Sequence, residues 1–336
     1  MSRSISHRLP GEAALPVEGR LASFDGATGW LNSEPLTPEG LQGRVVLVDF
    51  WTYTCVNWLR TLPYVRAWDA KYRDVGLTIV GPHTPEFGFE HDVDNVKRAV
   101  RELAVPYPVA IDSDYGVWQA FENHYCPAVY VADAEGRIRY HHFGEGEYEM
   151  TEMVIQQLLV ESGVEAVDRD LVSVEPRGLE VSADWRTVLS GETYAGYGQA
   201  TGFAQEDVAR YDEPFAYTAP PSLFLNDWAL SGSWTVTRAA ASSNDAGGRI
   251  AFHFHARDLN LVMGPSSNGA SNRFRVFLDG QPVGDAHGTD VDGDGAGILD
   301  DQRTYQLIRQ PGPIGERRFE IEFADAGAEA YCFTFG

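Results

Sequence analysis

Cys55 is the residue of this 336-residue chain whose position most favours chemistry. It follows the continuous apolar run Val45–Phe50, which is typical of a strand buried on both faces, and it precedes a segment with helical periodicity. A thiol at such a junction is exposed at the carboxyl edge of the sheet, and the unpaired N–H groups of the helix stabilise its thiolate. A lone cysteine is more often buried and inert, but this position favours a reactive thiol. We therefore predict that Cys55 is catalytic.

The elements that must position Cys55 alternate between strands and helices. The apolar patterns predict strands at 45–50, 77–81, 107–111, 128–131 and 137–142, and helices at 57–73, 91–104 and 149–162. Residues 1–43 contain many turn formers and are expected to form loops and hairpins. In the thioredoxin arrangement the first strands are parallel, an antiparallel hairpin follows them, and a helix comes last. We therefore predict an α/β thioredoxin-like fold over residues 1–163.

Beyond residue 184 the apolar pattern changes to period two. The alternation recurs at 250–254, 274–278, 319–323 and 331–335, between turns rich in Gly, Asn, Asp and Pro. Antiparallel strands that are buried on one face show this pattern, so residues 185–336 are predicted to form an all-β domain, a jelly roll or β-sandwich. Residues 164–184 lack a strong period and are expected to be a linker. Cys332 falls in the last of these strands and is expected to be a core residue.

Composition excludes several classes of partner. The net charge of −23 repels phosphate backbones and anionic lipid, so we expect neither nucleic acid nor a membrane surface as a partner. No apolar stretch approaches the length of a membrane-spanning helix, and residues 1–10 lack the apolar core of a secretory signal. As written, the sequence therefore predicts a cytoplasmic protein. Its 3 cysteines are too few for a disulfide framework.

Three stretches of the first half resemble a known family: residues 45–72, 83–87 and 143–147. Together they look like the DipZ-type thioredoxin-like proteins, which are relatives of the TlpA/ResA group of thiol–disulfide oxidoreductases. Residues 225–232 and 306–312 resemble the carbohydrate-binding-module-like sandwich of the same proteins. The resemblance implies thiol-based redox chemistry on protein thiols or disulfides. It also implies a location outside the cytoplasm, and a glycan as a candidate ligand of the second domain.

The chain departs from this family at the second cysteine of the active-site motif. In a Cys-x-x-Cys motif the first thiolate attacks a disulfide and the second thiol resolves the mixed disulfide. Here the motif reads Cys55-Val-Asn-Trp58, so tryptophan occupies the resolving position. Dithiol exchange within this one motif is therefore impossible.

Cys126 is the candidate for the missing thiol. It stands directly before Pro127, which opens the predicted strand 128–131. In the thioredoxin fold the proline at this place is cis and its loop faces the nucleophilic cysteine, which would bring Cys126 near Cys55. We predict that Pro127 shapes the substrate groove, and two readings of Cys126 stay open. It either packs beside the site without reacting or forms a disulfide with Cys55.

Two further hypotheses compete with thiol–disulfide exchange. Thr52 lies three residues before Cys55, as in the end of a peroxiredoxin motif, although Val48 replaces the proline of that motif. A one-cysteine peroxidase that forms a sulfenic acid at Cys55, with peroxide as substrate, is therefore the rival enzyme. The other rival is a redox-inactive protein that binds a partner or a glycan. Trp51 and Trp58 flank the thiol and are candidate substrate-binding residues, although such residues more often pack in a core.

Weaker patterns complete the candidates, and no cofactor is expected. Asp290, Asp292 and Asp294 have the spacing of half a calcium loop, but the acidic turn is the favoured reading because position 301 is Asp rather than the bidentate Glu. The histidine pairs 141–142 and 253–255 lack an evident third ligand, so no metal site is predicted. Aromatic residues of the second domain that could stack on sugar rings, although most are expected to fill the core, are Trp185, Tyr194, Tyr197, Trp228 and Trp234.

Overall fold

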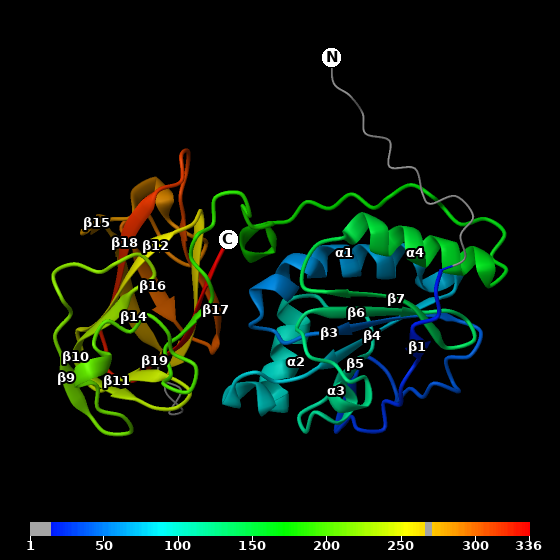
Figure 1. Ribbon diagram of the computed structural model, residues 1–336, viewed down its shortest axis with the longest axis horizontal. Coiled ribbons are helices and arrows are strands. Elements are labelled where there is room, and N and C mark those ends of the chain that lie inside the picture. Colours follow the sequence, from blue (N-terminus) through cyan, green and yellow to red (C-terminus); the bar gives the residue numbers. More distant parts are fainter. Residues whose placement is uncertain (1–14, 266–270) are drawn as a thin grey trace, which may run out of the picture. The chain divides into compact units, whose positions relative to one another are not determined.

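The computed structural model describes residues 15–265 and 271–336 and divides into two compact units (Figure 1). One unit comprises the residues up to Thr52 together with Thr61–Val174, and the other comprises Tyr53–Arg60 together with Glu175–Gly336. The division at 174 falls inside the linker that we predict at 164–184. Residues 1–10, which we weighed as a secretory signal, lie outside the described residues.

The first unit is built on one seven-stranded sheet in the order β1-β7-β6-β3-β4-β5-β2. Its strands are β1 (Gly19–Arg20), β2 (Gly29–Leu31), β3 (Val45–Phe50), β4 (Leu77–His83), β5 (Val109–Ile111), β6 (Ala128–Ala132) and β7 (Arg137–Phe143). Its helices are α1 (Val56–Tyr72), α2 (Val93–Glu102), α3 (Gly116–Ala120) and α4 (Tyr148–Glu161). Strands β3, β4 and β5 are parallel, and β6 and β7 close the sheet as an antiparallel hairpin. The thioredoxin-like fold predicted for this half is confirmed.

The prediction for residues 1–43 is corrected in one respect. We expected loops and hairpins there, but two short strands of this segment join the sheet at its two edges. β1 pairs with β7, and β2 pairs with β5. Strands of two and three residues show no measurable periodicity, so the apolar pattern could not reveal them.

Strand β3 occupies the centre of this sheet, and all six of its residues are buried. It pairs with β4 in parallel through Val45–Val48 and with β6 antiparallel through Val46–Phe50. Helices α1 and α4 cover one face of the sheet, and α2 and α3 lie on the other (Figure 1). A strand enclosed in this way needs apolar side chains on both faces, which explains the continuous run Val45–Val48.

The carboxyl ends of β3 and β4 stay aligned beyond the last paired residues. Trp51 forms an isolated parallel bridge with His83, and its indole Nε1 donates to the Gly81 carbonyl at 3.1 Å. The two rings meet edge to face with centroids 4.8 Å apart. His83 is enclosed here, and burial lowers its pKa to about 3. The imidazole is therefore neutral across the physiological pH range.

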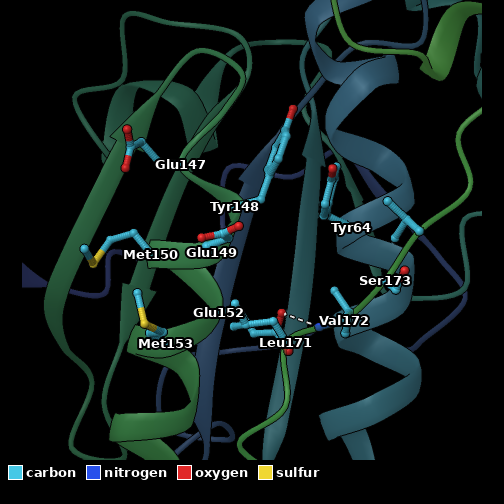
Figure 2. Close-up of a pocket in the computed structure, with 11 residues that line it drawn as sticks. Tyr64, Glu147, Tyr148, Glu149, Met150, Glu152, Met153, Leu171, Val172 and Ser173 are labelled. Carbon is cyan, nitrogen blue, oxygen red and sulfur yellow. Dashed lines mark hydrogen bonds between the residues drawn. The ribbon is translucent and has the colours of Figure 1, made fainter. Parts of the chain in front are cut away.

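The chain that follows α4 runs back along α1 and α4 (green in Figure 1) and is anchored on Glu152. This buried carboxylate of α4 accepts the backbone N–H of Val172 at 2.9 Å, drawn in Figure 2. It also accepts hydrogen bonds from side chains of α1, namely Trp68 at 3.3 Å, Lys71 at 3.4 Å and Tyr72 at 2.7 Å. Glu152 thus joins two helices and the segment after them.

Apart from Tyr53–Arg60, which include the start of α1, the second unit is all β, as predicted for residues 185–336. Twelve strands form one antiparallel sheet with the main path β15-β14-β18-β12-β10-β11-β19-β13-β17. The sheet divides within β10 (Trp228–Val236), whose first half pairs with β12 (Gly248–His255) and whose second half pairs with β9 and β11. The other strands are β8 (Thr193–Tyr194), β9 (Phe215–Tyr217), β11 (Ala241–Ser243), β13 (Asp258–Pro265), β14 (Asn272–Leu278), β15 (Gln281–Pro282), β16 (Ala296–Leu299), β17 (Arg303–Arg309), β18 (Glu316–Phe323) and β19 (Ala328–Phe335).

One continuous apolar core fills this unit. Alternate residues of β12, β14, β18 and β19 point into it, which is the period-two pattern of the sequence. Among the described residues of the whole chain, no helix is long and apolar enough to cross a membrane.

The hydrogen bonds of Glu152 predict a large effect of a small substitution. Glu152→Gln replaces one acceptor oxygen by a donor amide and leaves buried donors unpaired. We expect it to lower the unfolding free energy of the first unit by about 2–4 kcal/mol. The measurement is urea unfolding read from hydrogen exchange of the α4 peptides. Glu149→Gln, at an exposed residue of the same helix, is the matched control, and its unfolding free energy should stay within about 0.5 kcal/mol of that of the wild type. Equal effects of the two substitutions would contradict this account.

The burial of neutral His83 predicts a pH-dependent stability. The unfolded chain binds a proton at this residue below about pH 6.5, whereas the folded chain binds it only near pH 3, so stability falls as the pH falls between these values. His83→Asn removes this contribution. When the pH falls from about 7.5 to about 5.2, the unfolding free energy of the wild type should therefore decrease by about 1.5–2 kcal/mol more than that of the variant. Urea unfolding followed on the amide signals of β3 measures this difference. If the unfolding free energies of the wild type and the variant depend on pH in the same way, the prediction is wrong.

Candidate functional site

Cys55 lies directly before the first residue of α1, Val56, and five residues after the end of β3. Its backbone carbonyl accepts the first helical hydrogen bond, from Leu59 N at 2.9 Å. The residue is partly exposed. The predicted strand-to-helix junction is therefore confirmed, and a helix of 17 residues directs its unpaired N–H groups towards this end.

Cys126 and Pro127 lie where β6 begins. The peptide bond between them is cis, as predicted. Cys126 is partly exposed, and its Sγ lies 3.9 Å from the carbonyl oxygen of Phe50, the last residue of β3. Phe50 pairs with Ala128, so the cis-proline loop stands beside the end of β3. The disulfide between Cys55 and Cys126 stays a prediction.

Trp51 and Trp58 are both fully buried. Trp51 packs against His83 and donates to the Gly81 carbonyl, contacts that hold the ends of β3 and β4 together. This burial favours the packing role that we weighed against docking. Direct contact of either indole with a substrate stays a prediction.

Two buried polar residues near the end of β3 were not among the sequence candidates. Asp49 is completely buried within β3, and Tyr107 donates to its Oδ2 at 3.4 Å. Burial and the nearby charge of Asp49 raise the pKa of Tyr107 well above its usual value, so this hydroxyl stays a donor. A carboxylate in an otherwise apolar strand was the signal that could have identified Asp49.

His83 is a third residue that the sequence candidates lacked. Its Nε2 lies 3.4 Å from Oγ1 of Thr52, the residue that suggested a peroxiredoxin motif. The Thr52 hydroxyl is buried in this contact. A single histidine at the end of a buried strand does not stand out in the apolar pattern of the sequence. The contact between His83 and Thr52 therefore becomes evident only when β3 and β4 are aligned in parallel.

The remaining candidates in the second unit take structural positions. Cys332 is buried in β19, as predicted. Asp290 accepts Arg303 Nη1 at 2.8 Å, and Asp292 accepts the N–H groups of Asp294 at 3.0 Å and Ala296 at 2.9 Å. These carboxylates thus satisfy protein donors in an acidic turn. Within the described part of the chain, no cluster of three or more His, Cys, Asp and Glu residues could hold a metal ion.

The aromatic residues considered for sugar stacking differ in exposure. Trp228 and Trp234 are fully buried in the core, whereas Trp185 is 62% exposed. Tyr197 packs on Tyr211 with ring centroids 4.8 Å apart and borders a pocket of about 50 Å³, a space for one or two water molecules. Tyr194 is half-buried in β8. Glycan binding by this unit stays a prediction.

A larger pocket of about 510 Å³ is lined by residues of α1 and α4 and by residues 171–174 (Figure 2). Tyr64 of α1 and Tyr148 of α4 stack above it with centroids 3.8 Å apart, and Glu149 points towards its interior. Tyr64 is nine residues after Cys55, which is about 13 Å along the helix axis. The pocket is therefore separate from the thiol.

Two family models match consecutive parts of the chain. The Redoxin family model matches residues 26–159, and the model described as "Thioredoxin like C-terminal domain" matches residues 190–336. Protein DipZ of Mycobacterium bovis is 35% identical over 285 residues, which are 83% of this chain and 39% of that protein. The chain thus spans well under half the length of this relative.

Shorter proteins match less than half of the chain. The thiol–disulfide oxidoreductase YkuV of Bacillus subtilis is 31% identical over 142 residues, 42% of this chain and 95% of that protein. A solved structure of a thioredoxin-like protein in its oxidised form is 32% identical, with a TM-score of 0.40, and the match covers 43% of this chain and 96% of that one. The chain therefore belongs to the family of thioredoxin-like thiol–disulfide oxidoreductases that includes YkuV, and it is a homologue of the DipZ proteins.

Proposed function

We propose that this protein carries out thiol–disulfide exchange on protein substrates through Cys55, with Cys126 as the second thiol. The observation that carries the proposal is the partly exposed thiol of Cys55 at the amino terminus of α1. The helix end favours the thiolate, which is the attacking species. Homology to thiol–disulfide oxidoreductases supports the same chemistry.

The proposed reaction has two steps. The Cys55 thiolate attacks one sulfur of a substrate disulfide, which forms a mixed disulfide and releases the other substrate sulfur as a thiolate. The Cys126 thiolate then attacks the Cys55 sulfur, which releases the substrate as a dithiol and leaves a Cys55–Cys126 disulfide. The reverse sequence oxidises a substrate dithiol. Cys126 thus supplies the resolving thiol that Trp58 cannot supply.

Two features support the role of Cys126. It is partly exposed, as a thiol that exchanges with a substrate must be, and it immediately precedes the cis peptide bond to Pro127. We assign to Pro127 the shaping of the substrate groove, since this residue begins β6 beside the end of β3. Protein thiols and disulfides are the proposed partners. The cellular compartment stays a prediction from the sequence.

Oxidation with one equivalent of hydrogen peroxide, in the presence of a sulfenic-acid trap, tests the proposal. We expect mass spectrometry to find a Cys55–Cys126 cross-linked peptide that is about 2 Da lighter than the two reduced peptides together. Cys126→Ser should abolish the cross-link and leave a trapped sulfenic acid at Cys55, because no second thiol can condense with it. Cys332→Ser is the matched control, since Cys332 is buried and should not change the result.

Two outcomes would overturn the proposal. A trapped sulfenic acid at Cys55 in the wild type, with Cys126 still free, would favour the one-cysteine peroxidase. An unreactive Cys55 would leave only a binding role for the thioredoxin-like unit.

A further inference from the structure

An exposed row of aromatic rings begins at the cis-proline loop. Tyr125, which directly precedes Cys126, is 53% exposed, and its ring stacks on Phe143 with centroids 4.7 Å apart. Phe143 is 39% exposed and in turn packs on His141 at 4.8 Å. Apolar rings that lie together on a surface mark a candidate binding site, because their exposure to water costs free energy.

The far end of this aromatic row opens into a pocket of about 460 Å³. Its floor is the sheet surface at Tyr130 and Ile138, and one wall is Phe121, directly after α3. Glu18, Gly19 and Arg20 also line the pocket, at β1, the edge strand beside β7. His141 and Phe143 line the same pocket, so the aromatic row and the pocket are one continuous surface.

This surface is continuous with the exchange site in the cis-proline loop. Phe143 pairs with Ala128, two residues after Cys126, and the N–H of Gly144 donates to the Pro127 carbonyl at 2.9 Å. Extended chain advances about 3.3 Å per residue, and neighbouring strands are about 5 Å apart. A substrate chain that passes Pro127 in an extended conformation therefore places a side chain two or three residues further along within reach of Phe143.

We propose that the aromatic row and its pocket form a substrate subsite that binds an aromatic side chain of the polypeptide, two or three residues from the cysteine that pairs with Cys55. The inference rests on the proposed thiol–disulfide exchange and names the class of substrate. A second aromatic ring would add a stacking partner to Tyr125 and Phe143 and would remove their apolar surface from water.

The charges around the pocket fit an uncharged occupant. Glu18 and Arg20 stand on the β1 side, Glu122 stands on the opposite side, and Glu18 is within 2.7 Å of His141 Nδ1. No single sign of charge dominates, so neither an anionic nor a cationic group gains from entering. The net charge of −23 also disfavours acidic substrates. The expected sequence is a neutral or basic peptide with an aromatic residue near its cysteine.

The test uses symmetric disulfide dimers of the capped peptide Gly-X-Gly-Cys-Gly-X-Gly, with X as Phe or Ala, and the reduced full-length chain. We expect the Phe dimer to form the mixed disulfide with Cys55 about three to ten times faster than the Ala dimer. A double variant, Tyr125→Ala with Phe143→Leu, should bring this ratio of rates close to one. Phe224→Ala, which removes an aromatic ring 85% exposed on the second unit, should keep the wild-type ratio.

Peptides with Ser in place of Cys separate the subsite from the redox chemistry. Fluorescence anisotropy should show that the Phe version binds about three to ten times more tightly than the Ala version. If Cys55 reacts with neither dimer, the proposed exchange fails, and this binding ratio still decides the subsite. Equal binding of the two peptides would overturn the subsite, as would a Phe preference that persists in the double variant. The subsite would also be overturned if the wild-type chain dimerises, the double variant does not, and neither peptide is preferred.

Discussion

The pairing of β3 on both sides is the constraint on which the candidate site depends. β4 aligns with it in parallel and β6 in the antiparallel sense, and all six residues of β3 are buried. Because both neighbours are fixed along the strand, the end of β3 has little freedom. The Trp51–His83 bridge continues the alignment on one side, and the cis peptide bond before Pro127 stands on the other.

Much of this arrangement was predictable from the sequence. The apolar run of β3 and the helical periodicity after it placed Cys55 at a junction, and the expected thioredoxin fold implied a cis bond before Pro127. The period-two pattern predicted the all-β second unit. The features that escaped prediction are those without a periodic signal. Strands β1 and β2 are too short, and the meeting of His83 with Thr52 arises only when two parallel strands are brought into register.

The aromatic subsite illustrates the same limit. Tyr125 and Phe143 are far apart in the sequence, and each would be an ordinary exposed or half-buried aromatic by itself. The antiparallel pairing of β6 with β7 places Phe143 beside the cis-proline loop, and only this pairing makes a continuous surface. Asp49 is different, since a carboxylate inside an apolar strand was visible in the sequence and called for a functional explanation.

This chain differs from Cys-x-x-Cys proteins because Trp58 occupies the position of the resolving cysteine. The proposed exchange therefore depends on Cys126 as the second thiol. The most direct measurement is an equilibrium redox titration of the full chain in glutathione buffers, with free thiols counted by alkylation and mass spectrometry. The account predicts that Cys55 and Cys126 become oxidised together in one two-electron transition, which either Cys55→Ser or Cys126→Ser abolishes. Persistence of both free thiols across the titration, or a two-electron transition that survives Cys126→Ser, would contradict it.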